Sequence, residues 1–517
     1  MRRPLGIALL LAAWARAALA QAAPFHVEET SIAAIHAAMQ AGKLSCRQLV
    51  EQYLRRIAAY DKSGPAINAL VVVNPAAREI ADSLDRRFRA GRRLVGPLHC
   101  IPMIVKDNFE TVDLPTTAGS LSLKGFVSDR DAFQVKRIRE AGAIVLAKSN
   151  MAEFAFSPFE TVNSILPGYT KNPYALDRVT AGSSGGTAAA VAANLGEAGL
   201  GTDTGNSIRG PSAHNALVGI RSTMGLTSRS GVVPLNLGAD IAGPMARTVA
   251  DAVTVFQVVV GEDPADSATA PSHGRPPEDY AAALRRDGLK GARIGVLHQA
   301  YESPSADPEV LQVFANALEE LRRAGAELVD PAAVDSLDAW RRAQTGSCAP
   351  FKWDLNGWLA QHGDRVPVKS LEEIIRSRRF HPSIEARLQS SQAAELAPGE
   401  NPGCRSREEF RARLRRGVLR LMDSLRLDAL VYPTWSNPPR LIGDLNTPAG
   451  DNSQLFSPST GFPALTVPMG YTRDGALPAG LQFFGRPWSE ATLIRLAYAY
   501  EQATRHRHPP LSTPPLP

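Results

Sequence analysis

Three residues that could carry out nucleophilic chemistry lie among small or polar neighbours. Lys106 follows the apolar run "IPMIV", Ser183 stands in "AGSSGG", and Ser207 stands in "GLGTDTGNSIRGPSA". A lysine at the end of a buried strand loses water, which favours its neutral form and allows it to act as a base. Both serines have small neighbours that leave room for a substrate carbonyl. This combination predicts a serine nucleophile activated by a lysine.

Each of these features also has a simpler interpretation on its own. A lysine after a strand commonly extends to the surface, and a serine beside glycine commonly caps a helix or forms a turn. Glycine-rich runs suggest phosphate binding, but neither run contains a complete nucleotide-binding motif. The run 182–186 fits G-x-S-x-G with Ser184 as nucleophile, yet no histidine follows at a strand end to serve as its base. Only the combination of Lys106 with two serines favours catalysis.

Together these motifs resemble those of the amidase signature family of serine amidohydrolases. The matching stretches are "VKDN" at Lys106, "AGSSGG" at Ser183 and the run 199–235 around Ser207, and the resemblance extends over nearly all of the chain. It implies a Ser-cisSer-Lys triad. In that triad Ser207 attacks the carbonyl and forms an acyl-enzyme, Ser183 follows a cis peptide from Gly182 and relays the proton, and Lys106 is the base. The resemblance implies no metal and no cofactor.

The resemblance also assigns roles to the residues around the nucleophile. The oxyanion hole would consist of four consecutive backbone N–H groups, those of Thr204, Gly205, Asn206 and Ser207. Ser184 and Asp203 would support the triad loops through hydrogen bonds, and Arg209 would anchor the loop through an ion pair rather than take part in the chemistry. The family commonly has glycine where Asn206 stands, so this side chain would crowd the acyl pocket or add a polar contact.

Alternating strand and helix patterns predict an α/β fold. Residues 28–60 predict two helices, with Ser45 capping the second, and "TAAAVAANL" predicts a buried helix. Strands are predicted in "CIPMIVKDN", "GAIVLAKSN", "RIGVL", "DALVYPTW", "FPALTVPMG" and "AGLQFFGRP". We expect a single compact domain over residues 21–517, built on a large mixed, mostly parallel β-sheet flanked by helices. A variable, mainly helical region at about 331–425 would supply walls of the substrate pocket.

The first 20 residues have the composition of a secretion signal. They combine a basic start, a short apolar run and small residues at positions 18 and 20 that mark a cleavage site. The apolar run is shorter than a membrane-spanning helix requires, and Arg16 interrupts it, although an uncleaved anchor is the alternative. We expect a periplasmic or secreted protein with no stable membrane span after cleavage.

Composition argues against several classes of function. The chain has 517 residues, of which 44% are hydrophobic and 21% charged, as in ordinary globular proteins. Its net charge of +6 includes the runs "RRFRAGRR" and "REEFRARLRRG", which we interpret as solvated helix faces rather than a nucleic-acid site. None of the four cysteines lies in C-x-x-C, so a metal site has little support. Cys348 and Cys404 are the expected pair if any disulfide forms, and free buried thiols are the alternative.

The leading hypothesis is an exported amidohydrolase that cleaves the C–N bond of a small carboxamide and extends to esters or carbamates, as a monomer or homodimer. The alternatives are a noncatalytic binding protein on the same fold and the glutaminase subunit of a tRNA-dependent amidotransferase. Four aromatic residues suggest an aryl or apolar acyl group, and core packing explains them equally well: Phe154, Phe156, Trp353 and Trp358.

Overall fold

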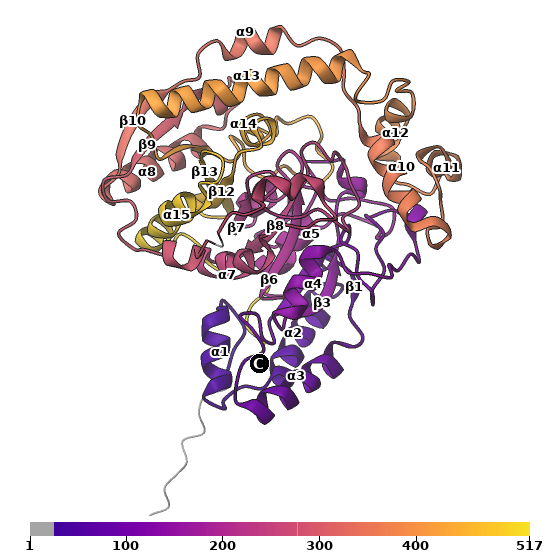
Figure 1. The fold of residues 1–517 in the computed structure, drawn as a ribbon. Coiled ribbons are helices and arrows are strands. Elements are labelled where there is room, and N and C mark those ends of the chain that lie inside the picture. The colour runs from indigo at the N-terminus through magenta and orange to yellow at the C-terminus, as the bar shows by residue number, and fades with distance from the viewer. Residues whose placement is uncertain (1–24, 277, 517) are drawn as a thin grey trace, which may run out of the picture.

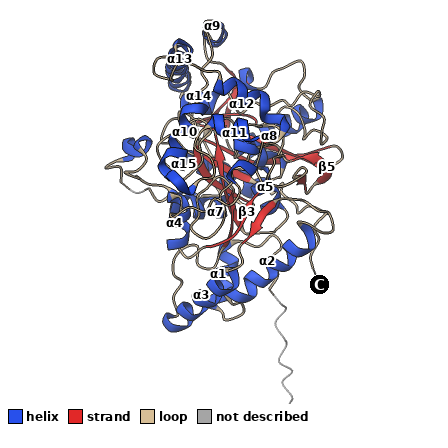
Figure 2. Cartoon of the chain, turned by 90° about the vertical axis from the view of Figure 1, so that its right-hand side faces the viewer, coloured by secondary structure: helices blue, strands red, loops and turns tan. Residues whose placement is uncertain are grey.

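An eleven-stranded sheet runs through the centre of the computed structural model, which describes residues 25–276 and 278–516, and helices surround it (Figures 1 and 2). The strands lie in the order β1 (Leu70–Val73), β3 (Ile144–Ser149), β2 (Pro102–Lys106), β6 (Ala198–Asp203), β8 (Ile241–Ala246), β7 (Val218–Arg221), β12 (Ala464–Thr472), β13 (Leu477–Phe484), β11 (Ala429–Pro433), β9 (Arg293–Leu297) and β10 (Glu327–Ala332). A separate two-stranded ribbon pairs β4 (Lys171–Asn172) with β5 (Ala175–Val179). The chain forms a single α/β domain, as predicted.

The sheet is mixed, as expected, but antiparallel neighbours outnumber parallel ones. β2 runs parallel to β3 and β6, and β9 runs parallel to β10 and β11. The other six neighbouring pairs are antiparallel. The expectation of a mostly parallel sheet is therefore corrected. Apolar runs carry no information about strand direction, and the short turn between β12 and β13 permits only antiparallel pairing.

The N-terminal helices lie where the sequence predicts them. α1 (Ile32–Gln40) and α2 (Cys46–Tyr60) are separated by a turn that ends at Ser45. Ser45 Oγ accepts the N–H of Gln48 at 3.1 Å, and the Gln48 side chain accepts the N–H of Ser45 at 2.9 Å. This reciprocal capping box satisfies N–H groups that the first turn of a helix leaves without partners. The predicted cap therefore fixes where α2 begins.

Small residues bring α5 (Gly185–Ala192) against the sheet. Every residue of this helix is buried. A Cβ on Gly199 of β6 would lie 2.4 Å from Thr187 Cγ2, and one on Gly186 would lie 2.3 Å from Asn150 O. The helix and its neighbours could not approach so closely with larger residues. The small-residue tract is therefore packed core that positions the start of α5.

The remaining helices form two groups. Those packed around the sheet are α3 (Ala77–Gly91), α4 (Phe133–Glu140), α6 (Arg209–His214), α7 (Val249–Val259), α8 (Pro308–Arg323), α14 (Phe456–Thr460) and α15 (Glu490–Thr504). The region 331–425 is helical, with α9 (Leu337–Arg342), α10 (Phe351–His362), α11 (Leu371–Ser377), α12 (Glu385–Gln392) and α13 (Pro402–Ser424). In Figure 1 the cluster α10–α12 stands to one side and α13 crosses above the sheet.

Two disulfides fasten the chain outside the sheet. Cys348 bonds to Cys404 and so links the segment before α10 to the first turn of α13. Cys46 bonds to Cys100 and links the start of α2 to the segment before β2. The first pair is the one expected from the sequence, and the second was not predicted. The proposed signal segment lies outside the described residues, and no helix within the described ranges is long and apolar enough to cross a membrane.

Candidate active site

Lys106 is the last residue of β2, and its side chain is wholly buried. Its Nζ lies 2.7 Å from Ser183 Oγ and 2.7 Å from Thr202 Oγ1 on β6. Burial outweighs the attraction of Asp203 and Asp240 and lowers the pKa of the Lys106 amine to about 7. At pH 7 the Lys106 amine is therefore neutral, and able to take up a proton, in about half of the molecules.

Asp107, the residue after Lys106, directs its carboxylate to other partners. Asp107 Oδ1 lies 3.8 Å from Lys148 Nζ. Its other carboxylate oxygen accepts hydrogen bonds from the hydroxyl of Thr117 and, at 3.1 Å, from the N–H of Gly119. These contacts fold the loop after β2 back onto the strand end. They fix the backbone at Lys106, and the Lys106 amine forms no ion pair with any of the described residues.

Ser183 follows Gly182 through a cis peptide bond. A Cβ on Gly182 would lie 2.3 and 2.5 Å from two backbone oxygens of a preceding loop, so the chain can pass this point only with glycine. The next residue, Ser184, stands at the N-cap of α5, and its Oγ lies 3.1 Å from Thr202 O and 3.3 Å from Thr202 N. These two bonds tie the serine loop to β6. Ser183 is thereby held against Lys106.

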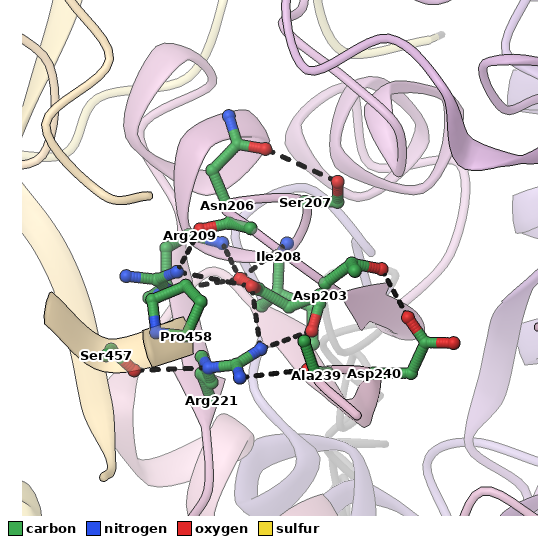
Figure 3. A network of polar contacts seen from close by, with 12 residues as sticks. Asp203, Asn206, Ser207, Ile208, Arg209, Arg221, Ala239, Asp240, Ser457 and Pro458 are labelled. Carbon is green, nitrogen blue, oxygen red and sulfur yellow. Dashed lines mark hydrogen bonds and ion pairs between the residues drawn. The ribbon is translucent and has the colours of Figure 1, made fainter. Parts of the chain in front are cut away.

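Asp203 ends β6 and lies buried between two guanidinium groups, those of Arg209 and Arg221, at 3.0 Å from each (Figure 3). The same carboxylate accepts the backbone N–H of Ile208 at 3.1 Å and that of Arg209 at 3.3 Å. Burial alone would raise the pKa of Asp203, but the two guanidinium groups lower it to about 2. Asp203 therefore stays ionised and anchors the turn 204–207, with Arg209 as its ion-pair partner.

The turn 204–207 borders a cavity. All four of its residues line a space of about 570 Å³, a size typical of small-molecule sites. Ile208 and Arg209 donate their N–H groups to Asp203, whereas no acceptor in the described part of the chain takes the N–H groups of 204–207. These N–H groups beside Ser207 are therefore available to an oxygen of a bound molecule.

The hydroxyl of Ser207 contacts Asn206 rather than Ser183. Ser207 Oγ lies 3.3 Å from Asn206 Oδ1 (Figure 3), and Asn206 Nδ2 donates to Pro158 O at 3.4 Å. The structure thus brings Lys106 and Ser183 together and leaves Ser207 bonded to its neighbour in the chain. The backbone of Asn206 does not adopt a left-handed conformation, so this residue fits the turn without a special backbone angle.

Several residues of the site had not been identified from the sequence. Thr202 contacts Lys106 and also accepts Asn108 Nδ2 at 3.1 Å. The hydroxyl of Thr204 donates to Asp240, and Arg221 completes the ion pairs of Asp203. Thr202 directly precedes Asp203, which was already a candidate, so its place in the sequence could have identified it. Arg221 and Asp240 reach the site from β7 and from the loop before β8, where the local sequence gives no such signal.

Among the residues that the structure describes, four arginines and no acidic side chain line the cavity. The four are Arg341, Arg387, Arg407 and Arg411. Two of them belong to "REEFRARLRRG", which we interpreted as a solvated face, yet Arg411 is 8% exposed and donates to Ser459 O, Gly238 O and Pro458 O. That interpretation is corrected for Arg407 and Arg411, because α13 turns this side toward the loops that enclose the cavity.

The aromatic residues divide between different places. Phe156 lines the cavity at Ser207. Trp353 and Trp358 instead line a second cavity of about 740 Å³ beside α10. Phe154 packs edge-on against Phe351 within the apolar cluster of α10–α12. The four aromatic residues therefore do not form one aryl-binding pocket.

Within residues 25–276 and 278–516, no group of three or more His, Cys, Asp or Glu side chains is arranged to hold a metal ion.

The chain matches a known protein family over most of its length. The sequence profile of the Amidase family matches residues 48–494. The protein of Arabidopsis thaliana named Probable amidase At4g34880 is 34% identical over 97% of this chain and 95% of its own length.

Other relatives match this chain over nearly its full length. A glutamyl-tRNA(Gln) amidotransferase subunit of Symbiobacterium thermophilum is 34% identical and covers 92% of this chain and 97% of its own. The crystal structure of native peptide amidase from Stenotrophomonas maltophilia superimposes with a TM-score of 0.84 at 39% identity, covering 93% of this chain and 98% of that one. The chain therefore belongs to the Amidase family, that of the amidase signature enzymes, and is a hydrolase of carbon–nitrogen bonds in amides.

Proposed function

We propose that the protein is an exported serine amidohydrolase in which Ser207 forms an acyl-enzyme with a small amide, Ser183 relays the proton and Lys106 is the base. The observation that carries this proposal is the buried Lys106 amine, 2.7 Å from Ser183 Oγ and with a pKa lowered to about 7. Such an amine can accept a proton at neutral pH, whereas an ordinary lysine is already protonated. The cavity at Ser207 supplies space for the substrate.

Acylation moves one proton inward as the new bond forms. When substrate binds, the Ser207 hydroxyl turns from Asn206 toward Ser183. Ser207 Oγ attacks the carbonyl carbon while its proton passes to Ser183 Oγ, and the proton of Ser183 passes to Lys106 Nζ. The negative charge gathers on the substrate oxygen, where the N–H groups of the turn 204–207 stabilise it. One such donor is typically worth about 3 kcal/mol in the transition state.

The second half of the cycle returns the proton. The C–N bond breaks as the proton held by Lys106 passes back through Ser183 to the leaving nitrogen, which departs as an amine or ammonia. A water molecule then gives its proton to the same relay and attacks the ester carbon. The carboxylic acid leaves, and Ser207 recovers its hydroxyl. Esters and carbamates fit the same scheme because they form the same kind of acyl-enzyme.

A fluorophosphonate probe tests this assignment of the nucleophile. The probe should label the wild type at Ser207 and should not label Ser207→Ala. Lys106→Ala should slow labelling by about 10²- to 10⁴-fold, the usual contribution of a general base. Ser459→Ala is the matched control, because Ser459 lines the same cavity, and it should label at the wild-type rate. A wild type that does not react, or that reacts at Ser184, would contradict the proposal.

Export is supported by the cysteines and the leading segment. All four cysteines are paired in disulfides, a state that persists in oxidising compartments. Expression of the full chain followed by cell fractionation should place the protein outside the cytoplasm, with a mature N-terminus soon after residue 20. Recovery of the intact chain from the cytoplasm with free thiols would contradict export.

The same evidence bears on the alternative, a component of a tRNA-dependent amidotransferase. Relatives named as glutamyl-tRNA(Gln) amidotransferase subunits are as similar to this chain as the Arabidopsis protein is. The two disulfides favour a hydrolase that works alone outside the reducing cytoplasm. The purified chain should therefore hydrolyse small amides without any other protein. Release of ammonia from glutamine that depends on an added partner would favour the amidotransferase instead.

A further inference from the structure

Three arginines around the cavity at Ser207 lack acidic partners. Of the four arginines that line it, Arg411 forms an ion pair with Glu408 at 2.6 Å. Arg341, Arg387 and Arg407 form no ion pair within the described ranges, and no Asp or Glu lines the cavity. Arg341 and Arg387 are exposed and Arg407 is half-buried, and positive charges gathered around one cavity repel one another. Such an arrangement is stabilised when an anion binds among them.

Arg407 has an unused donor inside the protein. It lies one turn after the start of α13, and its Nη1 donates to Cys348 O at 3.2 Å. Its Nε is buried and has no hydrogen-bond partner in the described part of the chain. Burial and the charge of Arg411 lower the pKa of Arg407 despite the opposing charges of Glu408 and Asp354, yet a guanidinium keeps its charge at neutral pH. Arg407 therefore brings a positive charge to the lining of the cavity.

Arg387 reaches the same cavity from α12. Its guanidinium lies 5.9 Å from the centre of the Phe156 ring, and its Nη1 donates to Phe156 O. Phe156 itself lines the cavity. The ring and the carbonyl hold the guanidinium plane while its other N–H groups stay available. Arg341, at the end of α9, adds a third positive charge to the lining.

Resting on the function proposed above, we propose that the preferred substrate is an amide that also carries a carboxylate, which Arg387 and Arg407 bind while Ser207 attacks the amide carbon. A carboxylate accepts paired hydrogen bonds from a guanidinium, and the arginines that line this cavity without an ion pair in the described ranges can donate them. A cavity of about 570 Å³ holds an amide together with a carboxylate several bonds away.

Two matched pairs of substrates test the carboxylate on each side of the scissile bond. On the acyl side, glutaric acid mono-4-nitroanilide is compared with the 4-nitroanilide of 5-oxohexanoic acid, in which a methyl ketone replaces the carboxylate. On the amine side, 4-acetamidobenzoate is compared with 4-acetamidoacetophenone. In at least one pair, kcat/KM should be about tenfold or more higher for the carboxylate, as expected for a charge-assisted bidentate contact.

Variants assign the preference to the two arginines. In Arg387→Gln/Arg407→Gln, the ratio of kcat/KM within the preferred pair should fall to about one. Arg405→Gln should keep the wild-type ratio. Arg405 lies on the same helix as Arg407 but is not among the described residues that line the cavity, and its guanidinium donates to Glu400 O. Thermal unfolding checks that each variant is folded. A double variant that is folded and keeps the full preference would overturn the proposal.

Binding separates this proposal from the catalytic one. Calorimetry with Ser207→Ala should give a Kd about tenfold or more lower for the carboxylate member of the preferred pair than for its neutral partner. Equal Kd values in both pairs would overturn the carboxylate preference. If wild type hydrolyses the neutral members in a Ser207-dependent manner but shows no preference, the proposed function stands and this inference fails. Carboxylate-selective binding without any hydrolysis would overturn the proposed function alone.

Discussion

The acid side of the pH–activity profile should report the protonation of Lys106. The amine must be neutral to accept a proton, and its pKa is lowered to about 7, so kcat/KM should rise with pH through about 7 and then level off. For one group with that pKa, the neutral fraction is about 9% at pH 6 and about 91% at pH 8. Activity should therefore increase about tenfold between these two values.

Removing the hydroxyl of Thr202 tests where this pKa comes from. Thr202 Oγ1 lies 2.7 Å from Lys106 Nζ and accepts a hydrogen bond that favours the ammonium form. Thr202→Val keeps the shape and removes the acceptor. A bond to a charged donor is worth about 1 kcal/mol more than a neutral one, which corresponds to a little under one pH unit. The midpoint of the profile should therefore move to lower pH by about 0.5–1 unit.

The assay measures initial rates with a chromogenic anilide from pH 5 to 9 at constant ionic strength. Substrate concentrations far below KM make these rates proportional to kcat/KM. Thr187→Val is the matched control, because Thr187 is equally buried but bonds to Ser149 Oγ at 2.6 Å rather than to Lys106. Its midpoint should equal that of the wild type. A flat profile would refute Lys106 as the base, and a midpoint that rises in Thr202→Val would refute the role of the hydrogen bond.

Three further predictions concern the surroundings of the site. Asn206→Gly should raise the acylation rate about 2- to 10-fold in rapid-mixing experiments, because it frees the Ser207 hydroxyl from a hydrogen bond worth about 0.5–1.5 kcal/mol; a slower burst would contradict this. Asp203→Asn should cost about 3–5 kcal/mol of unfolding free energy in urea, because it leaves two buried guanidinium groups without a carboxylate, and a loss below about 1 kcal/mol would count against that explanation. Cys348→Ala/Cys404→Ala should lower the unfolding free energy by up to about 4 kcal/mol in the same assay, because the two cysteines are 56 residues apart and their bond restricts the unfolded chain. Unchanged stability would show that the bond constrains the unfolded chain little.

The residues proposed to be catalytic could be selected from the sequence because each stands in a local motif. Lys106 follows an apolar strand, and Ser183 and Ser207 lie in runs whose small residues are needed for close packing. The capping of α2 by Ser45 was equally local. The strand β6 was missed, since the glycines of 199–203 hide the apolar pattern that marks a strand.

Contacts between distant segments were not identifiable in this way. Arg387 and Arg407 reach the cavity only because α12 and α13 pack against loops far away in the sequence, and their local patterns are those of ordinary surface helices. The same holds for the Cys46–Cys100 bond and for Arg221 at Asp203. Periodicity shows which face of a helix is polar, but it does not show what that face meets.

Trapping the acyl-enzyme tests the central claim most directly. Wild-type protein is mixed with an activated ester or anilide, quenched in acid within the first turnover, and digested for mass spectrometry. We predict an acyl group on Ser207 that is absent from Ser207→Ala and accumulates far more slowly in Lys106→Ala. An acyl group on Ser183 or Ser184, or turnover in the Ser207→Ala variant at the wild-type rate, would contradict the assignment of Ser207 as the nucleophile.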